Sequence, residues 1–258
     1  MHIEKLFDLQ GKNAVVTGGA GIYGTPITEA LAEAGAHVIV ASRNLEKCLH
    51  FAEEMKKRGL SVSGETYDQS DEQNIVSFHE RLMKKFGIID ILINNAVARP
   101  MKTFEDPARS WRESMDVNAS GLFIISRLFM NSMISQKSGS IINISSIQGV
   151  CAPRFQNYSG TNMTTPPDYH FHKHGLIGLT KYLAALGGPH GVRVNAISPG
   201  GFFSKDLTSE FSKKYCARTL LERPAGHDDI KGIIVLLAGP ASSYITGQNI
   251  IVDGGYTC

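Results

Sequence analysis

The chain has few cysteines, and none of them pair at a spacing that metal sites or disulfide frameworks use. Cys48, Cys151, Cys216 and Cys258 lie far apart, and no C-x-x-C motif occurs. Zinc sites and disulfide-rich scaffolds both need clustered or regularly spaced cysteines. We therefore expect free thiols, no bound metal, and a reducing, cytoplasmic location.

Long apolar runs and an excess of charge of one sign are also missing. No run of about 18 apolar residues occurs, the length that spans a membrane, and the N-terminal residues show no basic segment followed by an apolar one. We expect neither a transmembrane helix nor a secretory signal. The 26 basic residues nearly balance the 24 acidic ones and form no long run. The expected partner is therefore a small polar molecule rather than a nucleic acid or a membrane.

Short apolar segments alternate with longer segments of helical period along the whole chain. The apolar, strand-like segments are 13–18, 37–42, 61–68, 89–96, 139–146, 193–198 and 249–255. An apolar segment followed by a helical one is typical of a buried parallel strand with its crossover helix. The order predicts one α/β domain over residues 1–258, a Rossmann fold whose doubly wound sheet of seven parallel strands is flanked by helices.

Two segments depart from this alternation. Residues 150–168 are rich in Pro, Thr, Asn and Gly and have no clear period, which predicts a long loop. Residues 199–226 begin with turn residues and then show weak helical character, as expected of a mobile cover over a binding site.

A glycine-rich turn, TGGAGIYG at residues 17–24, follows the first strand segment and precedes a helical one. Read as G-x-G-x-x-G, it places Gly19, Gly21 and Gly24 as a dinucleotide fingerprint does. Glycines let the backbone approach a pyrophosphate, and the free N–H groups of the next helix face the same anion. The turn therefore predicts a dinucleotide cofactor.

The end of the second strand segment indicates which dinucleotide binds. An NAD site usually has an acidic residue there, which binds the ribose 2′-hydroxyl. Here the strand ends in Ser42 and Arg43 without a carboxylate, and the planar guanidinium of Arg43 suits a 2′-phosphate. We therefore predict NADP(H) in preference to NAD(H).

Tyr169 and Lys173 stand four residues apart at the start of a helical segment, where such residues share one face. A tyrosine hydroxyl, with a pKa near ~10, is a poor acid or base at neutral pH unless a cation stabilises its phenolate. Lys173 is placed to supply that cation. Such a pair also occurs on ordinary surface helices, so its meaning depends on the surrounding residues.

Taken together, the motifs resemble the short-chain dehydrogenase/reductase family from near residue 10 to the end of the chain. In order, they are TGGAGIYG (17–24), Asp68, NNA (94–96), Asn118 in DVNASG, INISS (142–146), YHFHKHGLIGLTK (169–181), RVNAISPGG (193–201) and YITGQNIIVDGG (244–255). The resemblance implies an NAD(P)(H)-dependent oxidoreductase with a one-domain Rossmann fold, usually a homotetramer or homodimer.

The resemblance also implies four catalytic residues. Tyr169 matches the general acid/base, and Lys173 the residue that lowers its pKa and binds the nicotinamide ribose. Ser146 matches the hydroxyl that holds the substrate oxygen, and Asn118 the residue that keeps a water in the proton path.

Tyr158 competes for the acid/base role, because it stands at the usual family distance from the catalytic serine. Four residues beyond it is Asn162, which supplies no cation. Tyr169 has the lysine, so 150–168 contains an insertion. Ser145 is assigned to packing.

The remaining family matches are to cofactor contacts. They are Gly18, Gly21, Ile22, Tyr23, Gly24, Ser42, Arg43, Asp68, Gln69, Asn94, Asn95, Ala96, Pro199, Gly200, Phe202 and Ser204, together with Tyr169 and Lys173. Ile22 replaces the middle glycine of the family motif, so we expect Gly21 to approach the pyrophosphate while Ile22 and Tyr23 face the nicotinamide. Asn94 has an alternative reading as a link between strands, and Asp68 as a turn residue.

Residues 150–168 resemble the longer serine-to-tyrosine loop of flagellin-modification oxidoreductases and, more loosely, the sugar and sugar-acid dehydrogenases near gluconate 5-dehydrogenase. This resemblance implies a polyhydroxylated substrate, acidic in some of these enzymes. Arg99, Gln148 and Arg154 are the candidate substrate contacts. Both arginines belong to loops at the carboxyl ends of strands, where a guanidinium can bind a carboxylate or phosphate.

We therefore predict an NADP(H)-dependent oxidoreductase that interconverts a secondary alcohol and a ketone by hydride transfer, on a sugar, sugar acid or cyclitol. Two alternatives stay open: a reductase of a hydrophobic ketone, such as a 3-oxoacyl thioester or a steroid, and a catalytically silent NADP(H)-sensing regulator. The polar residues of 150–168 disfavour the first, and the complete catalytic set disfavours the second.

Overall fold

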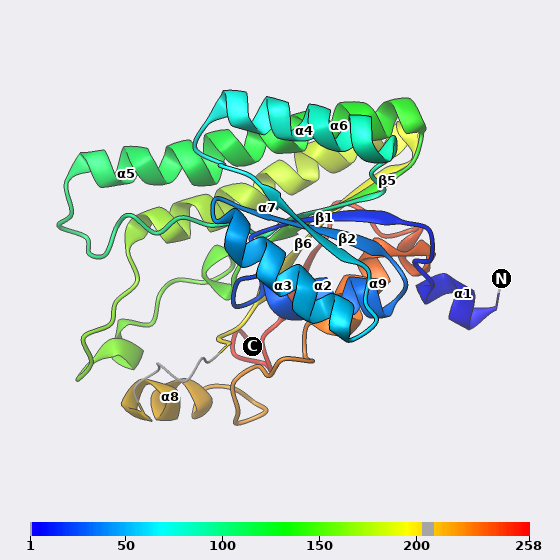
Figure 1. Ribbon diagram of the computed structural model, residues 1–258. Coiled ribbons are helices and arrows are strands. Elements are labelled where there is room, and N and C mark those ends of the chain that lie inside the picture. Colours follow the sequence, from blue (N-terminus) through cyan, green and yellow to red (C-terminus); the bar gives the residue numbers. More distant parts are fainter. Residues whose placement is uncertain (1, 203–208) are drawn as a thin grey trace.

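The computed structural model describes residues 2–202 and 209–258 (Figure 1). Its centre is a parallel sheet of seven strands in the order β3-β2-β1-β4-β5-β6-β7. The strands are β1 (Asn13–Thr17), β2 (His37–Ser42), β3 (Val62–Thr66), β4 (Ile91–Asn94), β5 (Gly139–Ile144), β6 (Val192–Pro199) and β7 (Asn249–Val252). The predicted strand segments and the doubly wound Rossmann fold are confirmed.

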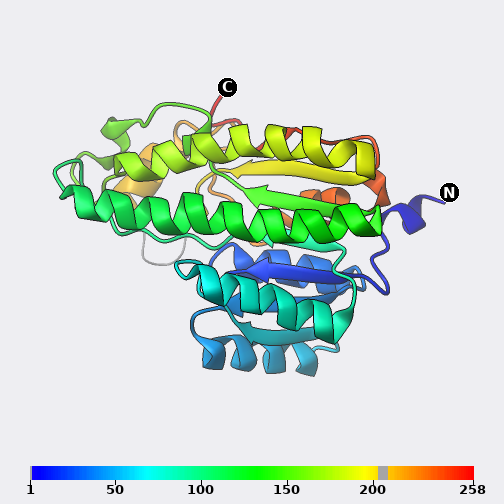
Figure 2. The same ribbon diagram turned by 90° about the horizontal axis from the view of Figure 1, so that it is seen from above.

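Helices cover both faces of the sheet (Figures 1 and 2). The helices are α1 (Ile3–Phe7), α2 (Gly24–Glu33), α3 (Leu45–Lys57), α4 (Glu72–Phe86), α5 (Ala108–Met115), α6 (Leu122–Gln136), α7 (Pro167–Gly187), α8 (Ser209–Cys216) and α9 (Lys231–Ala238). α2, α3 and α9 pack on one face, and α4, α6 and α7 on the other. Each face has its own apolar core, as expected of a sheet buried on both sides.

The strand β1 shows why an unbroken apolar segment suits this position. Ala14 and Val16 belong to the core on the α2 side, whereas Val15 belongs to the core on the α4 side. Successive side chains of a strand point to opposite faces, so a strand buried on both faces needs apolar residues at every position.

The predicted loop 150–168 ends earlier than expected. It contains a short 3₁₀ turn, Phe155–Tyr158, and α7 already begins at Pro167, with Pro166 as its N-cap. Proline has no backbone N–H to donate and is favoured in the first turn of a helix. The prolines therefore fix the start of the helix that carries Tyr169 and Lys173.

In the segment 199–226, the helical character is confirmed by α8. Residues 203–208 lie outside the described residues. Before them, Phe202 pairs with Ala225 in an isolated parallel bridge.

α5 and α6 run together through a π-helical turn, Asp116–Gly121, as one helix over Ala108–Gln136. Among the described residues, this is the one helix that is long and apolar enough to cross a membrane by length and composition alone. Ile125, Phe129 and Met133 on its inner face are buried against the sheet. A core helix of a globular fold passes the same test, so the helix is weak evidence for a membrane span.

Candidate active site

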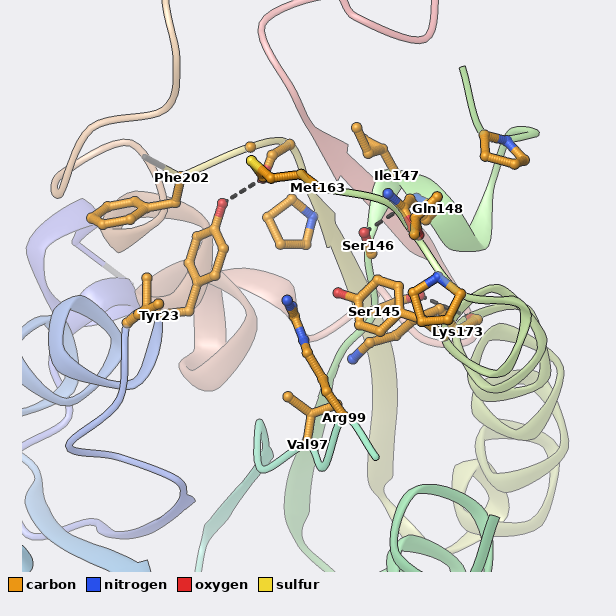
Figure 3. A pocket seen from close by; sticks show the side chains of 18 of the residues that line it. Tyr23, Val97, Arg99, Ser145, Ser146, Ile147, Gln148, Met163, Lys173 and Phe202 are labelled. Atoms are coloured by element: carbon orange, nitrogen blue, oxygen red, sulfur yellow. Dashed lines mark hydrogen bonds between the residues drawn. The ribbon is translucent and has the colours of Figure 1, made fainter. Parts of the chain in front are cut away.

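The loops that follow β1, β4, β5 and β6 enclose a cavity of about 760 Å³ at the carboxyl edge of the sheet. This volume falls in the range of small-molecule sites. Most of the predicted site residues line it: Gly18, Gly21, Ile22, Tyr23, Asn95, Ala96, Arg99, Ser146, Gln148, Arg154, Tyr169, Lys173, Pro199, Gly200 and Phe202. Figure 3 shows Tyr23 and Phe202 on one side of the cavity and Ser146 and Lys173 on the other.

Other predicted residues do not line the cavity. These are Gly24, Ser42, Arg43, Asp68, Gln69, Asn94 and Asn118. Ser204 lies outside the described residues.

Tyr169 and Lys173 lie on consecutive turns of α7 and both line the cavity. The lysine is only 5% exposed, and its Nζ donates a hydrogen bond to the Ile144 carbonyl at 2.7 Å. The same Nζ lies 5.5 Å from the centroid of the Tyr169 ring. The ammonium group is therefore fixed beside the phenol.

The surroundings of Tyr169 lower its pKa below the ordinary tyrosine value. Burial raises the pKa, but the positive charges of Lys173 and Arg99 and hydrogen bonds with Ser146 and Arg99 lower it by more. A lowered pKa brings a tyrosine closer to the range in which it can both accept and donate a proton. This environment fits the predicted acid/base role.

Ser146 and Ser145 have different roles at the end of β5. The Ser146 hydroxyl accepts a hydrogen bond from the Gln148 backbone N–H at 3.1 Å and contacts the Tyr169 hydroxyl. The Ser145 hydroxyl donates to the Lys173 carbonyl at 2.9 Å and is buried. Ser145 thus packs β5 against α7, as expected, while Ser146 faces the acid/base.

Arg99 lies closer to Tyr169 than its place in the sequence indicates. Its guanidinium carbon is 4.7 Å from the centroid of the Tyr169 ring, and Figure 3 shows the side chain extending into the cavity from the loop after β4. A guanidinium over an aromatic face is attracted to it. Arg99 is therefore a second cation on Tyr169, as well as a candidate substrate contact.

Tyr158 lines the same cavity in a different electrostatic setting. Its hydroxyl accepts a hydrogen bond from Gln148 Nε2 at 3.1 Å. Burial raises the pKa of Tyr158, opposite in direction to the shift of Tyr169. This contrast supports Tyr169 as the acid/base.

Asn118 lies in the π-helical turn and is bonded away from the cavity. Its Oδ1 accepts from the Ala98 N–H at 2.9 Å, and its Nδ2 donates to the Ala98 carbonyl at 2.8 Å and to Ser114 Oγ at 3.1 Å. The amide ties the loop after β4 to the helix. Both atoms of the side-chain amide therefore have protein partners. The predicted contact of Asn118 with a water in the proton path stays a prediction.

The side-chain amides of Asn94 and Gln69 also form hydrogen bonds within the protein interior. Asn94 Nδ2 donates to Ser126 Oγ at 3.0 Å and to Asn143 Oδ1 at 2.8 Å, so the structural reading of Asn94 applies. Gln69 Nε2 donates to the Val117 carbonyl at 2.9 Å. The Gln69 side chain therefore ties the segment after β3 to the π-helical turn, and the role of Gln69 in cofactor binding stays a prediction.

The glycine-rich turn is closely packed at both ends. Gly18 has a φ of +66°, and a Cβ on Gly24 would lie 2.0 Å from the Gly18 carbonyl oxygen. Asn95 Nδ2 donates to the same carbonyl at 3.1 Å. Ile22, in place of the family's middle glycine, is 60% exposed and has room for its side chain. The close approach of Gly21 to a pyrophosphate stays a prediction.

Tyr23 connects the glycine turn to the loop after β6. Its hydroxyl donates to the Gly200 carbonyl at 2.6 Å, and its ring lies 5.2 Å from the Phe202 ring. Burial raises the pKa of Tyr23, so its hydroxyl stays protonated and able to donate.

The residues beyond β2 and β3 form a more open part of the edge. Arg43 is exposed, and Asp68 Oδ1 accepts from the N–H and hydroxyl of Ser70 at 2.9 and 2.7 Å. Burial raises the pKa of Asp68, but these bonds and the charge of Arg43 lower it by more. Ser42 Oγ donates to the Asn44 carbonyl at 3.2 Å.

The turn and the β2 end together fit an NAD(P) cofactor. A Cβ on Gly24 would collide with the Gly18 carbonyl, so only glycine lets α2 begin this close to the turn, and Gly18, Asn95 and Ala96 line the cavity beside it. A helix N-terminus follows directly, as in anion sites of this kind. These residues would hold the pyrophosphate, and Lys173 the nicotinamide ribose.

The histidines around Tyr169 form no metal cluster within 2–202 and 209–258. His172 is buried with its ring edge-on to Tyr169 at 5.2 Å. Burial, with the charges of Lys173 and Arg99, lowers the pKa of His172 to about 3. His172 is therefore neutral beside Tyr169.

Sequence reasoning missed a group of residues that complete the cavity wall. Met163, Phe211, Tyr215 and Tyr256 form an apolar and aromatic wall, and Asp168 adds a carboxylate next to Tyr169. The aromatic residues come from segments far apart in the chain, so no local pattern marks them. In the sequence, Asp168 is indistinguishable from an ordinary acidic residue in the first turn of a helix, so nothing marks it as part of a site.

Comparison with protein families gives a match over nearly the whole chain. A family profile described as enoyl-(acyl carrier protein) reductase matches residues 19–257. A 3-oxoacyl-[acyl-carrier-protein] reductase of Aquifex aeolicus is 35% identical, over 96% of this chain and 98% of its own. A gluconate 5-dehydrogenase of Gluconobacter oxydans is 31% identical over 98% and 97%. A galactitol 2-dehydrogenase of Rhizobium johnstonii is 33% identical over 100% of both.

Solved structures agree with this match. A gluconate 5-dehydrogenase from Burkholderia cenocepacia, in complex with NADP and tartrate, superposes with a TM-score of 0.90 at 30% identity over 99% of each chain. A short-chain dehydrogenase from Leptospira borgpetersenii with bound NAD+ gives a TM-score of 0.87 at 29% identity, over 100% of this chain and 96% of its own. Similar proteins thus bind either NADP or NAD+.

Proposed function

This chain belongs to the short-chain dehydrogenase/reductase family, and we propose that it interconverts a secondary alcohol and a ketone on a sugar, sugar acid or cyclitol with NADP(H). Membership makes it an NAD(P)-dependent oxidoreductase that acts on CH–OH groups. The substrate class and the preference for NADP(H) are the proposal.

The chemistry divides between the cofactor and the residues of the cavity. The nicotinamide, when bound, exchanges a hydride with the substrate carbon. Tyr169 exchanges the hydroxyl proton, and Lys173 with Arg99 stabilises its phenolate form. Ser146 contacts the Tyr169 hydroxyl and holds the substrate oxygen next to it.

The observation that carries the proposed substrate class is the presence of two arginines in the wall that contains Tyr169. Arg99 and Arg154 both line the cavity, and a guanidinium suits a carboxylate or several hydroxyl oxygens. Gln148 and Asp168 add polar atoms to the wall. A gluconate 5-dehydrogenase bound to tartrate, a hydroxy acid, has the same fold. These features support a polyhydroxylated substrate.

A 3-oxoacyl thioester is a second candidate, favoured by the apolar wall. Met163, Phe211, Tyr215 and Tyr256 could line an acyl chain, and a relative at 35% identity is a 3-oxoacyl-[acyl-carrier-protein] reductase. The two arginines have no role in binding an alkyl chain.

A panel of ketones separates the two candidates. We expect NADPH oxidation with 5-keto-gluconate or a ketohexose to exceed that with an acetoacetyl thioester by about tenfold or more in kcat/KM. Initial rates would be measured by NADPH absorbance at equal enzyme concentration. A reversed order, with the thioester preferred, would contradict the proposed substrate class.

The preference for NADP(H) rests on Arg43. The side chain is exposed at the end of β2, and its charge reaches Asp68 at the end of β3. We expect Arg43→Ser to weaken NADPH binding roughly tenfold, because a charged hydrogen bond to the 2′-phosphate is lost, and to leave NADH binding nearly unchanged. Titration by cofactor fluorescence measures both. Lys47→Ala removes an exposed cation one turn away and is the matched control; equal weakening by both variants would indicate a general charge effect.

A further inference from the structure

Asp168 is a buried carboxylate in the wall of the catalytic cavity. It lies in the first turn of α7, directly before Tyr169, lines the cavity, and is only 1% exposed. Its Oδ1 is buried without a hydrogen-bond donor from any residue that the structure describes. A buried acceptor in this state is costly unless some other group supplies the donor.

Three other polar side chains of the cavity wall have hydrogen-bond partners of their own. Gln148 Oε1 accepts from the Thr165 hydroxyl at 2.5 Å, and Gln148 Nε2 donates to the Tyr158 hydroxyl at 3.1 Å. Asn157 Nδ2, further along the wall, donates to the Tyr256 hydroxyl at 2.7 Å. Each of these groups already has a partner other than Asp168, whose Oδ1 stays without a donor among the described residues.

A role in helix stability does not account for this placement. An acidic residue in the first turn is favoured by the helix dipole, by about 0.3–1 kcal/mol at exposed sites. That effect needs neither burial nor a position in a cavity wall. The N-cap of α7 is Pro166, and Asp168 makes no cap hydrogen bond there.

We propose that Asp168 forms a subsite that accepts a hydrogen bond from a substrate hydroxyl near the reacting carbon. The subsite rests on the proposed function, because it selects among ketones that Tyr169 reduces. The unpartnered Oδ1 is a hydrogen-bond acceptor, so it favours a hydroxyl at this place over an ester, an ether or an alkyl group, none of which can donate. With Arg99 and Arg154 in the same wall, the cavity combines an unpartnered acceptor with two cationic donors, a set complementary to a polyol or a hydroxy acid.

The test compares ketones that differ by one group. Cyclohexanone, 2-hydroxycyclohexanone, 3-hydroxycyclohexanone and 2-methoxycyclohexanone share a ring, but only the hydroxyketones offer a donor. We expect the wild-type protein to prefer the better hydroxyketone to cyclohexanone by about tenfold or more in kcat/KM, the effect of one charged hydrogen bond. The methoxy compound should gain nothing over cyclohexanone.

Variants assign that preference to Asp168. We expect D168N to reduce the ratio several-fold and D168A to bring it near one, mainly through the KM for the hydroxyketone. E105Q neutralises an exposed carboxylate outside the cavity wall and should keep the wild-type ratio. Melting temperatures show whether each variant folds, and the comparison with the methoxy compound in the wild-type protein does not depend on any variant.

The outcomes separate this proposal from the proposed function. If the wild-type protein prefers hydroxyketones and D168A keeps that preference, or if the methoxy compound is as good as the hydroxyketone, the subsite is wrong and the proposed function stands. If the wild-type protein reduces acetoacetyl thioester but none of the hydroxyketones, the proposed function fails and the subsite fails with it.

Discussion

Tyr169→Phe is expected to abolish turnover while leaving NADP(H) binding nearly intact. The variant removes the only atom of this side chain that can exchange a proton, and a positioned acid/base typically contributes 10²–10⁴-fold, so we expect a loss of kcat of roughly 10³-fold. The ring, its contact with Arg99 and the position of Lys173 need not change. Rates by NADPH absorbance and cofactor affinity by fluorescence test the two halves separately.

Tyr158→Phe is the matched control, because it removes a hydroxyl from the same cavity wall. That hydroxyl accepts from Gln148, and the pKa of Tyr158 is raised by burial. We expect this variant to lose less than about tenfold, the effect of one neutral hydrogen bond. If Tyr169→Phe kept near-normal activity while Tyr158→Phe did not, the acid/base assignment would be reversed.

The fold could be predicted because its sheet is buried on both faces. Each strand in such a sheet needs an apolar segment, and β1 illustrates this with Ala14, Val15 and Val16 divided between two cores. The prolines at 166 and 167 resemble loop residues in the sequence, so the pattern predicts a later start for α7 than the structure has. In the structure Pro166 is the N-cap and Pro167 opens the first turn.

The placement of Tyr169 and Lys173 side by side in the cavity could also be predicted, since it depends on local geometry. Tyr169 and Lys173 are four residues apart on one helix, and that spacing alone places both on one face. The glycine turn is equally local, and steric contact between Gly24 and Gly18 explains its composition.

The side-chain hydrogen bonds and contacts that join distant segments could not be predicted in this way. Asn118 and Gln69 belong to recognisable motifs, yet their amides bond to backbone groups outside the cavity. Arg99 was expected to bind substrate, and its contact with the Tyr169 ring connects residues far apart in the chain. A motif indicates that a residue lies near a site, whereas only the packed structure shows which hydrogen bonds remain free.

Arg99→Gln is expected to move the pH dependence of activity toward higher pH. Arg99 lowers the pKa of Tyr169 both by its charge and by a hydrogen bond, so its removal raises that pKa. Alcohol oxidation needs the phenolate as base, and at pH 7 we expect it to fall roughly 10- to 100-fold, as for the loss of one charge within a few ångströms. The rate should recover as the pH is raised. Profiles of kcat/KM against pH, with a neutral alcohol as substrate, measure this shift.

The reverse reaction gives the opposite sign and therefore tests the cause. Ketone reduction needs the protonated phenol, so its alkaline decline should move to higher pH in Arg99→Gln, and activity at high pH should be retained better than in the wild-type protein. Arg99→Lys keeps a charge, so both limbs of the pH profiles, the rise of alcohol oxidation and the alkaline decline of ketone reduction, should shift less. Arg109→Gln removes an exposed arginine outside the cavity wall and should shift neither limb. If Arg99 acted only as a substrate ligand, KM would rise while both limbs stayed in place. Movement of both limbs together would instead show that Arg99 sets the proton affinity of Tyr169.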